Sequence, residues 1–176
     1  MNMQRPYKDF KERWLWKKID YDWAFGYQCV DLIKLYADKC LGMWKIWAIG
    51  NAKDVPNGKF WKKFTKIEWM DNIMQWDIIV KTNSKYWHIA IVDRILWDKV
   101  YVLEQNGSGK NSWNWLWANA IRVQPYNKTF YQIILRSKKI ISNFDKEAEY
   151  VDAMIKEREQ LLKDTKEYKD SLTYTK

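Results

Sequence analysis

The sequence predicts an α+β domain in which helices from the N-terminal part pack on an antiparallel β-sheet. Apolar residues at helical spacing come first, from Cys29 to about Leu41. Runs rich in β-branched and aromatic residues follow, and turn residues separate them. The connections between these runs are too short to hold crossover helices, so neighbouring strands should be antiparallel. The predicted strands are Asp77–Lys81, His88–Ile95, Lys99–Gln105, Ile121–Gln124 and Phe130–Arg136.

Two helices precede this sheet in the sequence. Residues 6–18 are basic and predict one helix, and the helix that begins at Cys29 has a single apolar face. That face consists of Val30, Ile33, Ala37 and Leu41. Residues 42–75 contain many turn residues, so we expect irregular chain there, with room for one short helix.

The C-terminal segment has a different character. A narrow apolar stripe in a charged sequence predicts an amphipathic helix over residues 144–169. The stripe consists of Phe144, Ala148, Val151, Ile155 and Leu162. We therefore expect residues 1–140 to form the folded domain and residues 141–176 a charged helical tail. Because the stripe is as narrow as a coiled-coil seam, the tail could form a homodimer or pack on the domain.

Composition and charge narrow the class of protein. Hydrophobic residues make up 47% and charged residues 30% of the chain, which is typical of a globular protein. The net charge of +9 favours an anionic partner, and nucleic acid, a membrane surface and an anionic cell wall all qualify. No apolar run approaches the roughly 18 residues of a membrane-spanning helix. The opening residues lack the apolar core of a secretory signal, so we expect the protein to be made in the cytosol.

The two cysteines differ in their predicted positions. On one helix they would lie about 16 Å apart, and a disulfide needs Cα atoms within about 7 Å. Cys29 opens its helix, where unpaired backbone N–H groups and the positive end of the helix dipole favour a reactive thiolate. The same groups, with the Gln28 side chain, could bind the oxyanion of an acyl-transfer intermediate. The alternative is that Cys29 is a small buried hydrophobe, and Cys40 is expected to have only a packing role.

His88 is the single histidine, so it is the one imidazole that could serve Cys29 as a base. Side chains alternate along the strand from Lys99, which places Glu104 and Asn106 on one face. An odd number of loop residues before this strand keeps His88 on the same face, where either residue could orient it. A two-residue loop at Trp97-Asp98 would put them on opposite faces. Glu104 and Asn106 could also be no more than polar residues at a strand end.

Four segments, in this order, resemble the CHAP family of cysteine- and histidine-dependent amidohydrolases and peptidases. They are Gly26-Tyr27-Gln28-Cys29-Val30-Asp31-Leu32, Asp77-Ile78-Ile79-Val80, His88-Ile89-Ala90-Ile91-Val92 and Val102-Leu103-Glu104-Gln105-Asn106. The resemblance covers about residues 12–136. It implies a papain-like fold and a peptidoglycan hydrolase, an N-acetylmuramoyl-L-alanine amidase or an endopeptidase, of the kind found in phage lysins. The roles it implies are nucleophile for Cys29, general base for His88, orienting carboxylate for Glu104 and a supporting role for Asn106.

A second group of polar residues precedes the nucleophile. The run from Asp20 to Gly26 resembles the calcium loop of some CHAP lysins. The resemblance implies carboxylate ligands from Asp20, Asp22 and Asp31 and backbone carbonyl ligands from Ala24 and Gly26, which are the oxygen donors that Ca²⁺ prefers. The alternative is that Asp20 and Asp22 form turns and Asp31 caps the helix.

The chain contains 13 Trp and only 6 Gly, and several Trp stand where a turn favours Gly. Examples are Trp76, Trp97, Trp113 and Trp115, and the CHAP family usually has Gly at the positions of Trp23, Trp76 and Trp87. We hypothesise that many of these Trp come from UGA codons that the source organism translates as Gly. The alternative is authentic Trp that fill the core or stack on sugars.

The sequence leaves other functions open. One is a non-catalytic basic protein that binds the cell wall or nucleic acid through Lys, Arg and interleaved aromatic residues. Another is hydrolysis of an amide outside the wall by the same residues. We expect bacterial peptidoglycan as the partner, no nucleic acid, and action on the wall after release from the host cytoplasm.

Overall fold

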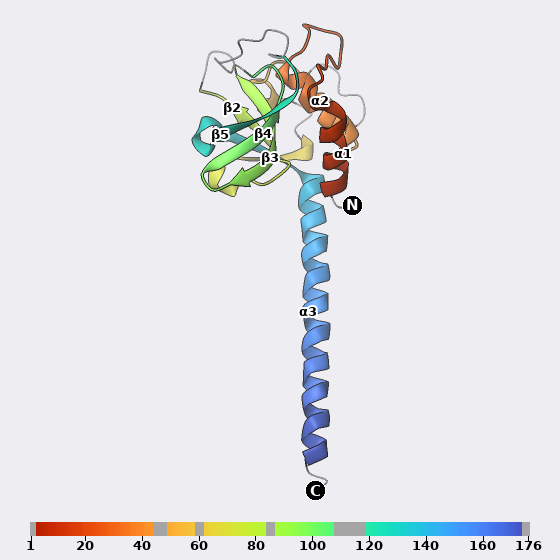
Figure 1. The fold of residues 1–176 in the computed structure, drawn as a ribbon. Helices are drawn as coiled ribbons and strands as arrows, with labels where there is room; N and C mark the ends of the chain where they lie inside the picture. The colour runs from red at the N-terminus through yellow and green to blue at the C-terminus, as the bar shows by residue number, and fades with distance from the viewer. Residues whose placement is uncertain (1–2, 44–48, 59–61, 84–86, 108–118, 174–176) are drawn as a thin grey trace. The chain divides into compact units, whose positions relative to one another are not determined.

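The structure is a computed structural model that describes residues 3–43, 49–58, 62–83, 87–107 and 119–173 (Figure 1). The chain divides into two compact units, Met1–Ile140 and Ile141–Lys176. The helices are α1 (Gln4–Trp14), α2 (Cys29–Lys39) and α3 (Lys138–Thr173), and short 3₁₀ turns are η1 (Val55–Asn57), η3 (Met70–Asn72) and η4 (Lys128–Phe130). The strands are β1 (Phe64–Ile67), β2 (Ile78–Lys81), β3 (His88–Leu96), β4 (Lys99–Glu104), β5 (Arg122–Asn127) and β6 (Ile133–Ser137).

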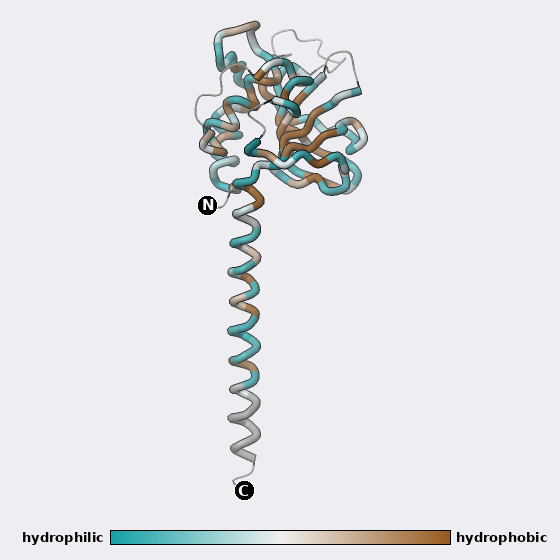
Figure 2. Tube along the Cα trace, turned by 180° about the vertical axis from the view of Figure 1, so that it is seen from behind, coloured by the Kyte–Doolittle hydropathy of each residue, from teal (hydrophilic) through white to brown (hydrophobic). Residues whose placement is uncertain are grey.

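The six strands form one sheet in the order β1-β6-β2-β3-β4-β5, and every neighbouring pair is antiparallel. The predicted α+β class, with helices and an antiparallel sheet, is therefore confirmed. Strands β2 and β3 lie in the interior of the sheet, and the apolar residues Ile78–Val80 of β2 and Ile89–Val92 of β3 are fully buried. Helix α2 packs against β3, and Figure 2 shows the hydrophobic residues of this unit gathered on the strands and on the helix faces next to them.

Two parts of the sequence prediction need correction. The helix predicted over residues 6–18 ends at Trp14, because the backbone of residues 16–17 pairs with the chain just before β5: Trp16 N donates to Ile121 O, and Ile121 N donates to Lys17 O, both at 2.8 Å. Strand β1 lies inside the segment expected to be irregular. It is a four-residue edge strand with two exposed positions, so it lacks the long apolar run that marks the other strands.

Tryptophan stands at several left-handed backbone positions. Six non-glycine residues of the described chain have positive φ, and four of them are Trp. They are Trp16 (67°), Trp23 (60°), Phe25 (64°), Trp76 (73°), Trp97 (59°) and Asn106 (53°). A bulky residue is rare in this region, whereas glycine adopts it at no steric cost. The conformations support the glycine hypothesis at these four Trp but not at Trp87, and Trp113 and Trp115 lie outside the described residues.

Within the second unit, α3 exposes a series of apolar side chains. The described ones are Tyr150, Val151, Met154, Ile155, Leu161 and Leu162, each at least half exposed. This helix contains the predicted range of residues 144–169 and begins directly after β6. None of the helices in the described parts of the chain is long and apolar enough to span a membrane.

Candidate active site

Cys29 is the first residue of α2, and the polar segment before it fixes this start. Gln28 precedes the helix in an extended conformation, and its backbone N–H donates to the Asp31 carboxylate at 2.9 Å. Asp31 thus caps the helix, as one of the two sequence interpretations expected. The Cys29 thiol is partly exposed at this N-terminus. Cys40, by contrast, is buried at the other end of α2, and burial raises the pKa of its thiol to about 12.

The face on which His88 lies depends on an irregularity in β3. The turn between β3 and β4 has two residues, Trp97 and Asp98, which by itself would put His88 and Glu104 on opposite faces. However, the register shifts by one residue at a β-bulge between Val92 and Arg94. Because Ile91 pairs with Leu103 beyond the bulge, Glu104 falls opposite Ala90, and His88 two residues away shares its face.

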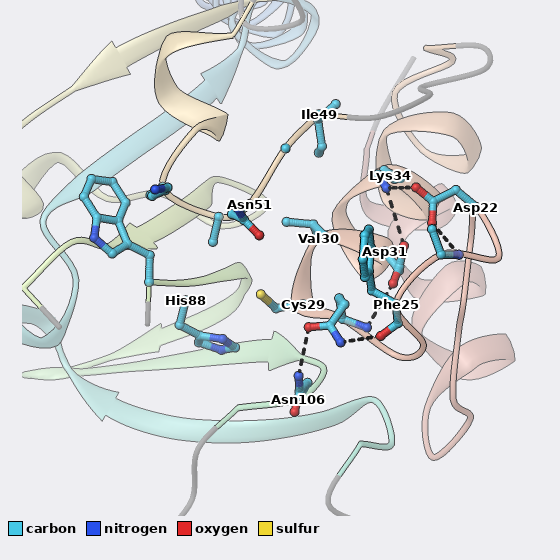
Figure 3. Close-up of a pocket in the computed structure, with 16 residues that line it drawn as sticks. Asp22, Phe25, Cys29, Val30, Asp31, Lys34, Ile49, Asn51, His88 and Asn106 are labelled. Atoms are coloured by element: carbon cyan, nitrogen blue, oxygen red, sulfur yellow. Dashed lines mark hydrogen bonds and ion pairs between the residues drawn. The ribbon is translucent and has the colours of Figure 1, made fainter. Parts of the chain in front are cut away.

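The His88 imidazole lies between Cys29 and Glu104. Its Nε2 atom is 2.9 Å from Glu104 Oε2, which leaves Nδ1 for the thiol, and Figure 3 shows the Cys29 sulfur directed towards the ring. Burial lowers the pKa of His88, but hydrogen bonds to Cys29 and Glu104 and the charges of both groups raise it more. The resulting pKa is about 9, so the imidazolium is the main form at neutral pH.

Glu104 is fully buried and held by two residues of β5 that the sequence analysis did not identify. Arg122 Nε and Nη2 lie 3.2 and 3.1 Å from Glu104 Oε1, and the Tyr126 hydroxyl donates to both carboxylate oxygens at 3.1 and 3.0 Å. Burial raises the pKa of Glu104, but His88, Arg122 and Tyr126 together lower it by more, so Glu104 is a carboxylate. Gly107 leaves room for this carboxylate, because a Cβ there would collide with it.

These contacts form a chain of alternating charges. The His88 imidazolium, the Glu104 carboxylate and the Arg122 guanidinium follow one another, and the Cys29 thiol lies at the His88 end of this series. Each buried charge has a partner of opposite sign, which the cost of burying an isolated charge requires. The β4–β5 register, which places Arg122 directly opposite Glu104, is the signal that could have identified Arg122.

The end of β4 also connects to the start of α2. Gln105 is fully buried; its Nε2 donates to the carbonyls of Ile19 at 2.6 Å and Gln28 at 2.9 Å, and its Oε1 accepts from Ile19 N. Asn106 Nδ2 donates to Gln28 Oε1 at 3.3 Å, and Gln28 Nε2 donates to Phe25 O at 2.7 Å. Asn106 therefore contacts Gln28 across the cleft, whereas Glu104 is the residue that binds His88. Gln105 holds the nucleophile's helix against the strand that carries Glu104.

A cleft of about 830 Å³ opens over these residues (Figure 3). Four of the predicted catalytic residues line it, Gln28, Cys29, His88 and Asn106, and Glu104 lies buried behind His88. Trp87 is also in the wall of the cleft. The structure therefore brings the five predicted catalytic residues together in one place.

The three aspartates of the predicted calcium loop also come together at the edge of this cleft. Asp20, Asp22 and Asp31 each place a carboxylate oxygen within 4.8 Å of the other two. Oδ1 atoms of Asp20 and Asp31 are buried without a hydrogen-bond partner. Burial, and the charges of Asp22 and Asp20, raise the pKa of Asp31, although its bond from Gln28 N and the Lys34 charge lower it. Buried carboxylate oxygens without donors fit a hard cation such as Ca²⁺.

Two further observations bear on this fit. The Ala24 N–H donates to Asp22 Oδ1 at 3.2 Å, and Gly26 has a φ of +70°, so the chain turns at both positions of the loop. The Lys34 ammonium also lies within the group, 2.5 Å from Asp22 Oδ2. The hydrogen bond and charge of Lys34 lower the pKa of Asp22 in spite of burial.

Comparison with known proteins supports the fold. No protein-family model and no curated protein match this chain. Among solved structures, the wild-type endolysin LysIME-EF1 is 19% identical with a TM-score of 0.58, over 73% of this chain and 61% of that chain. Ly7917, alone and with the hydrolyzing product of MDP, is 18% identical with a TM-score of 0.44, over 62% of this chain and 53% of that chain. The fold is endolysin-like, and the chain spans about three fifths of the endolysin's length.

Proposed function

We propose that this protein is a cysteine hydrolase that cuts an amide bond in bacterial peptidoglycan. The observation that carries the proposal is the arrangement of Cys29 at a helix N-terminus, facing an imidazole whose other nitrogen is held by the buried Glu104. The CHAP resemblance assigns the same residues to the same roles. The likeness to an endolysin, a class of phage enzyme that degrades peptidoglycan, supports the substrate. The net charge of +9 suits approach to an anionic wall.

The geometry supports a two-step mechanism. The Cys29 thiolate attacks the carbonyl carbon, and the oxyanion accepts hydrogen bonds from the N–H groups of the first turn of α2 and from the Gln28 side chain. The His88 imidazolium then donates its Nδ1 proton to the leaving amine, the C–N bond breaks, and an acyl-enzyme remains. His88, now neutral, takes a proton from water, which attacks the thioester and releases the acid and the thiolate.

Glu104 has a positioning role in this mechanism. It accepts the hydrogen bond from His88 Nε2, which keeps Nδ1 directed at the sulfur and stabilises the imidazolium. Arg122 and Tyr126 hold the carboxylate from the other side. The bond that is cut would be the N-acetylmuramoyl-L-alanine amide or a peptide bond of the stem or cross-bridge. We propose that the protein acts on the wall after release from the host cell.

The test is lysis of purified cell walls, followed as loss of turbidity. Cys29→Ser and His88→Ala should each lower the rate by orders of magnitude, because each removes a group that forms or breaks a bond. Cys40→Ser is the matched control, since Cys40 is buried away from the cleft, and it should retain the parent rate. Full lysis by Cys29→Ser would overturn the assignment.

We propose, in addition, that the loop before Cys29 binds Ca²⁺. Asp20, Asp22 and Asp31 would supply carboxylate oxygens, and Ala24 and Gly26 would supply the backbone carbonyls that the CHAP resemblance implies. When bound, the ion would supply positive charge that fixes the loop beside the nucleophile's helix. The measurement is a calorimetric titration with Ca²⁺ and with Mg²⁺. If neither ion gives a heat of binding, the loop is not a metal site.

A further inference from the structure

Lys34 is a buried lysine in the second turn of α2. Its side chain is 4% exposed, and its Nζ atom lies 2.5 Å from Asp22 Oδ2 and 3.6 Å from Asp31 Oδ1. A lysine is almost never this buried unless it is paired. Figure 3 shows its ammonium directed at the two aspartates, on the side of the loop that faces α2.

The ammonium only partly satisfies the group of carboxylates. Three carboxylates face one positive charge, and the Oδ1 atoms of Asp20 and Asp31 have no hydrogen-bond donor. A calcium ion lies about 2.3–2.6 Å from each oxygen that binds it. An ion bound to Asp22 Oδ2 and Asp31 Oδ1 would therefore occupy the space between them, where the ammonium now lies.

We propose that Lys34 is a built-in counter-ion that competes with calcium for this loop. This inference rests on the proposed calcium site and concerns how tightly that site binds. Without metal, Lys34 neutralises part of the charge and holds Asp22 and Asp31 together. Calcium must displace the ammonium into water, so the loop fills at higher calcium concentrations than a loop without this lysine would need.

The first experiment measures calcium affinity by calorimetry on the full chain, without any wall substrate, so its outcome is independent of hydrolysis. Lys34→Met keeps the length of the side chain and removes the charge, and it should bind Ca²⁺ at least tenfold more tightly than the parent. Lys39→Met is the control, because Lys39 lies on the same helix but is exposed and pairs with Asp38. Equal affinity of the parent and Lys34→Met, or binding to neither, would overturn the inference.

A second experiment uses the unmodified protein and so does not depend on the folding of a variant. Amine acetylation is measured by mass spectrometry at each lysine, with and without Ca²⁺. Displacement from the carboxylates should expose the Lys34 amine, so calcium should increase its labelling severalfold and leave Lys39 unchanged. Labelling of Lys34 that calcium lowers or leaves unchanged would show that the ammonium is not displaced, and the inference would fail.

Discussion

Replacing Trp23 and Trp97 by Gly should stabilise the protein if these positions are naturally glycine. Both have left-handed φ, 60° and 59°, and both side chains are at least 90% exposed, so little packing is lost. The left-handed conformation destabilises the folded state by about 1–2 kcal/mol for an L-residue. Glycine avoids this cost, but the greater conformational entropy of its unfolded chain lowers the free energy of unfolding by roughly 0.4–1 kcal/mol. The net gain is about 1 kcal/mol at each site, or a rise of about 4–8 °C in Tm for the pair.

The assay is thermal unfolding of the parent and the double variant at one protein concentration. Trp69→Gly is the matched control: Trp69 is 75% exposed, but its φ of −100° is ordinary for any residue. Glycine there relieves no strain, so Trp69→Gly should lower stability by roughly 0.5–1 kcal/mol. If the double variant melts at or below the temperature of the parent, the tryptophans are tolerated without strain, and the glycine hypothesis loses its physical basis at these positions.

Three further predictions concern the site and the tail. Tyr126→Phe removes one donor to Glu104 and should lower wall lysis about tenfold with the fold intact, because a hydrogen bond to a charged group is worth roughly 1.5–3 kcal/mol; parent-like lysis would exclude a role for this hydroxyl. The pKa of His88 is raised from 6.5 to about 9, so its contribution to stability is complete below pH 6.5 and is lost as pH rises through 9. The stability difference between the parent and His88→Gln, from denaturant melts, should shrink by up to about 3 kcal/mol over that range, and a constant difference would contradict the raised pKa. Truncation after Ser142 should leave wall lysis intact, since the catalytic residues lie in the first unit. Loss of lysis in a folded truncation would instead assign the tail a role in hydrolysis. We propose that the tail pairs with the tail of a second copy, and gel filtration of the full chain and the truncation would reveal this.

The sequence was most informative where a local pattern decides the structure. The start of α2 followed from its apolar periodicity and its polar cap, and the structure begins the helix at Cys29. The end of α1 could not be predicted locally, because it depends on backbone bonds from residues 16–17 to Ile121, which is more than a hundred residues away. The contacts of Arg122 and Tyr126 with Glu104 could not be predicted for the same reason, because the register of β4 with β5 brings these residues together.

The position of His88 shows how a distant element can set the geometry of the cleft. The two-residue turn alone would place His88 and Glu104 on opposite faces of the sheet, and the bulge at Asp93 shifts the register so that they share one face. Asp93 is itself a buried carboxylate, whose Oδ1 accepts from Tyr7 and Lys11 of α1 at 3.0 and 2.7 Å. These bonds stabilise the extra residue in the strand, so α1 helps to hold the register that places His88 on the same face as Glu104. In the sequence, the bulge was marked only by an acidic residue, Asp93, within an apolar strand. It could not be interpreted locally, because one of its partners, Lys11, is 82 residues away.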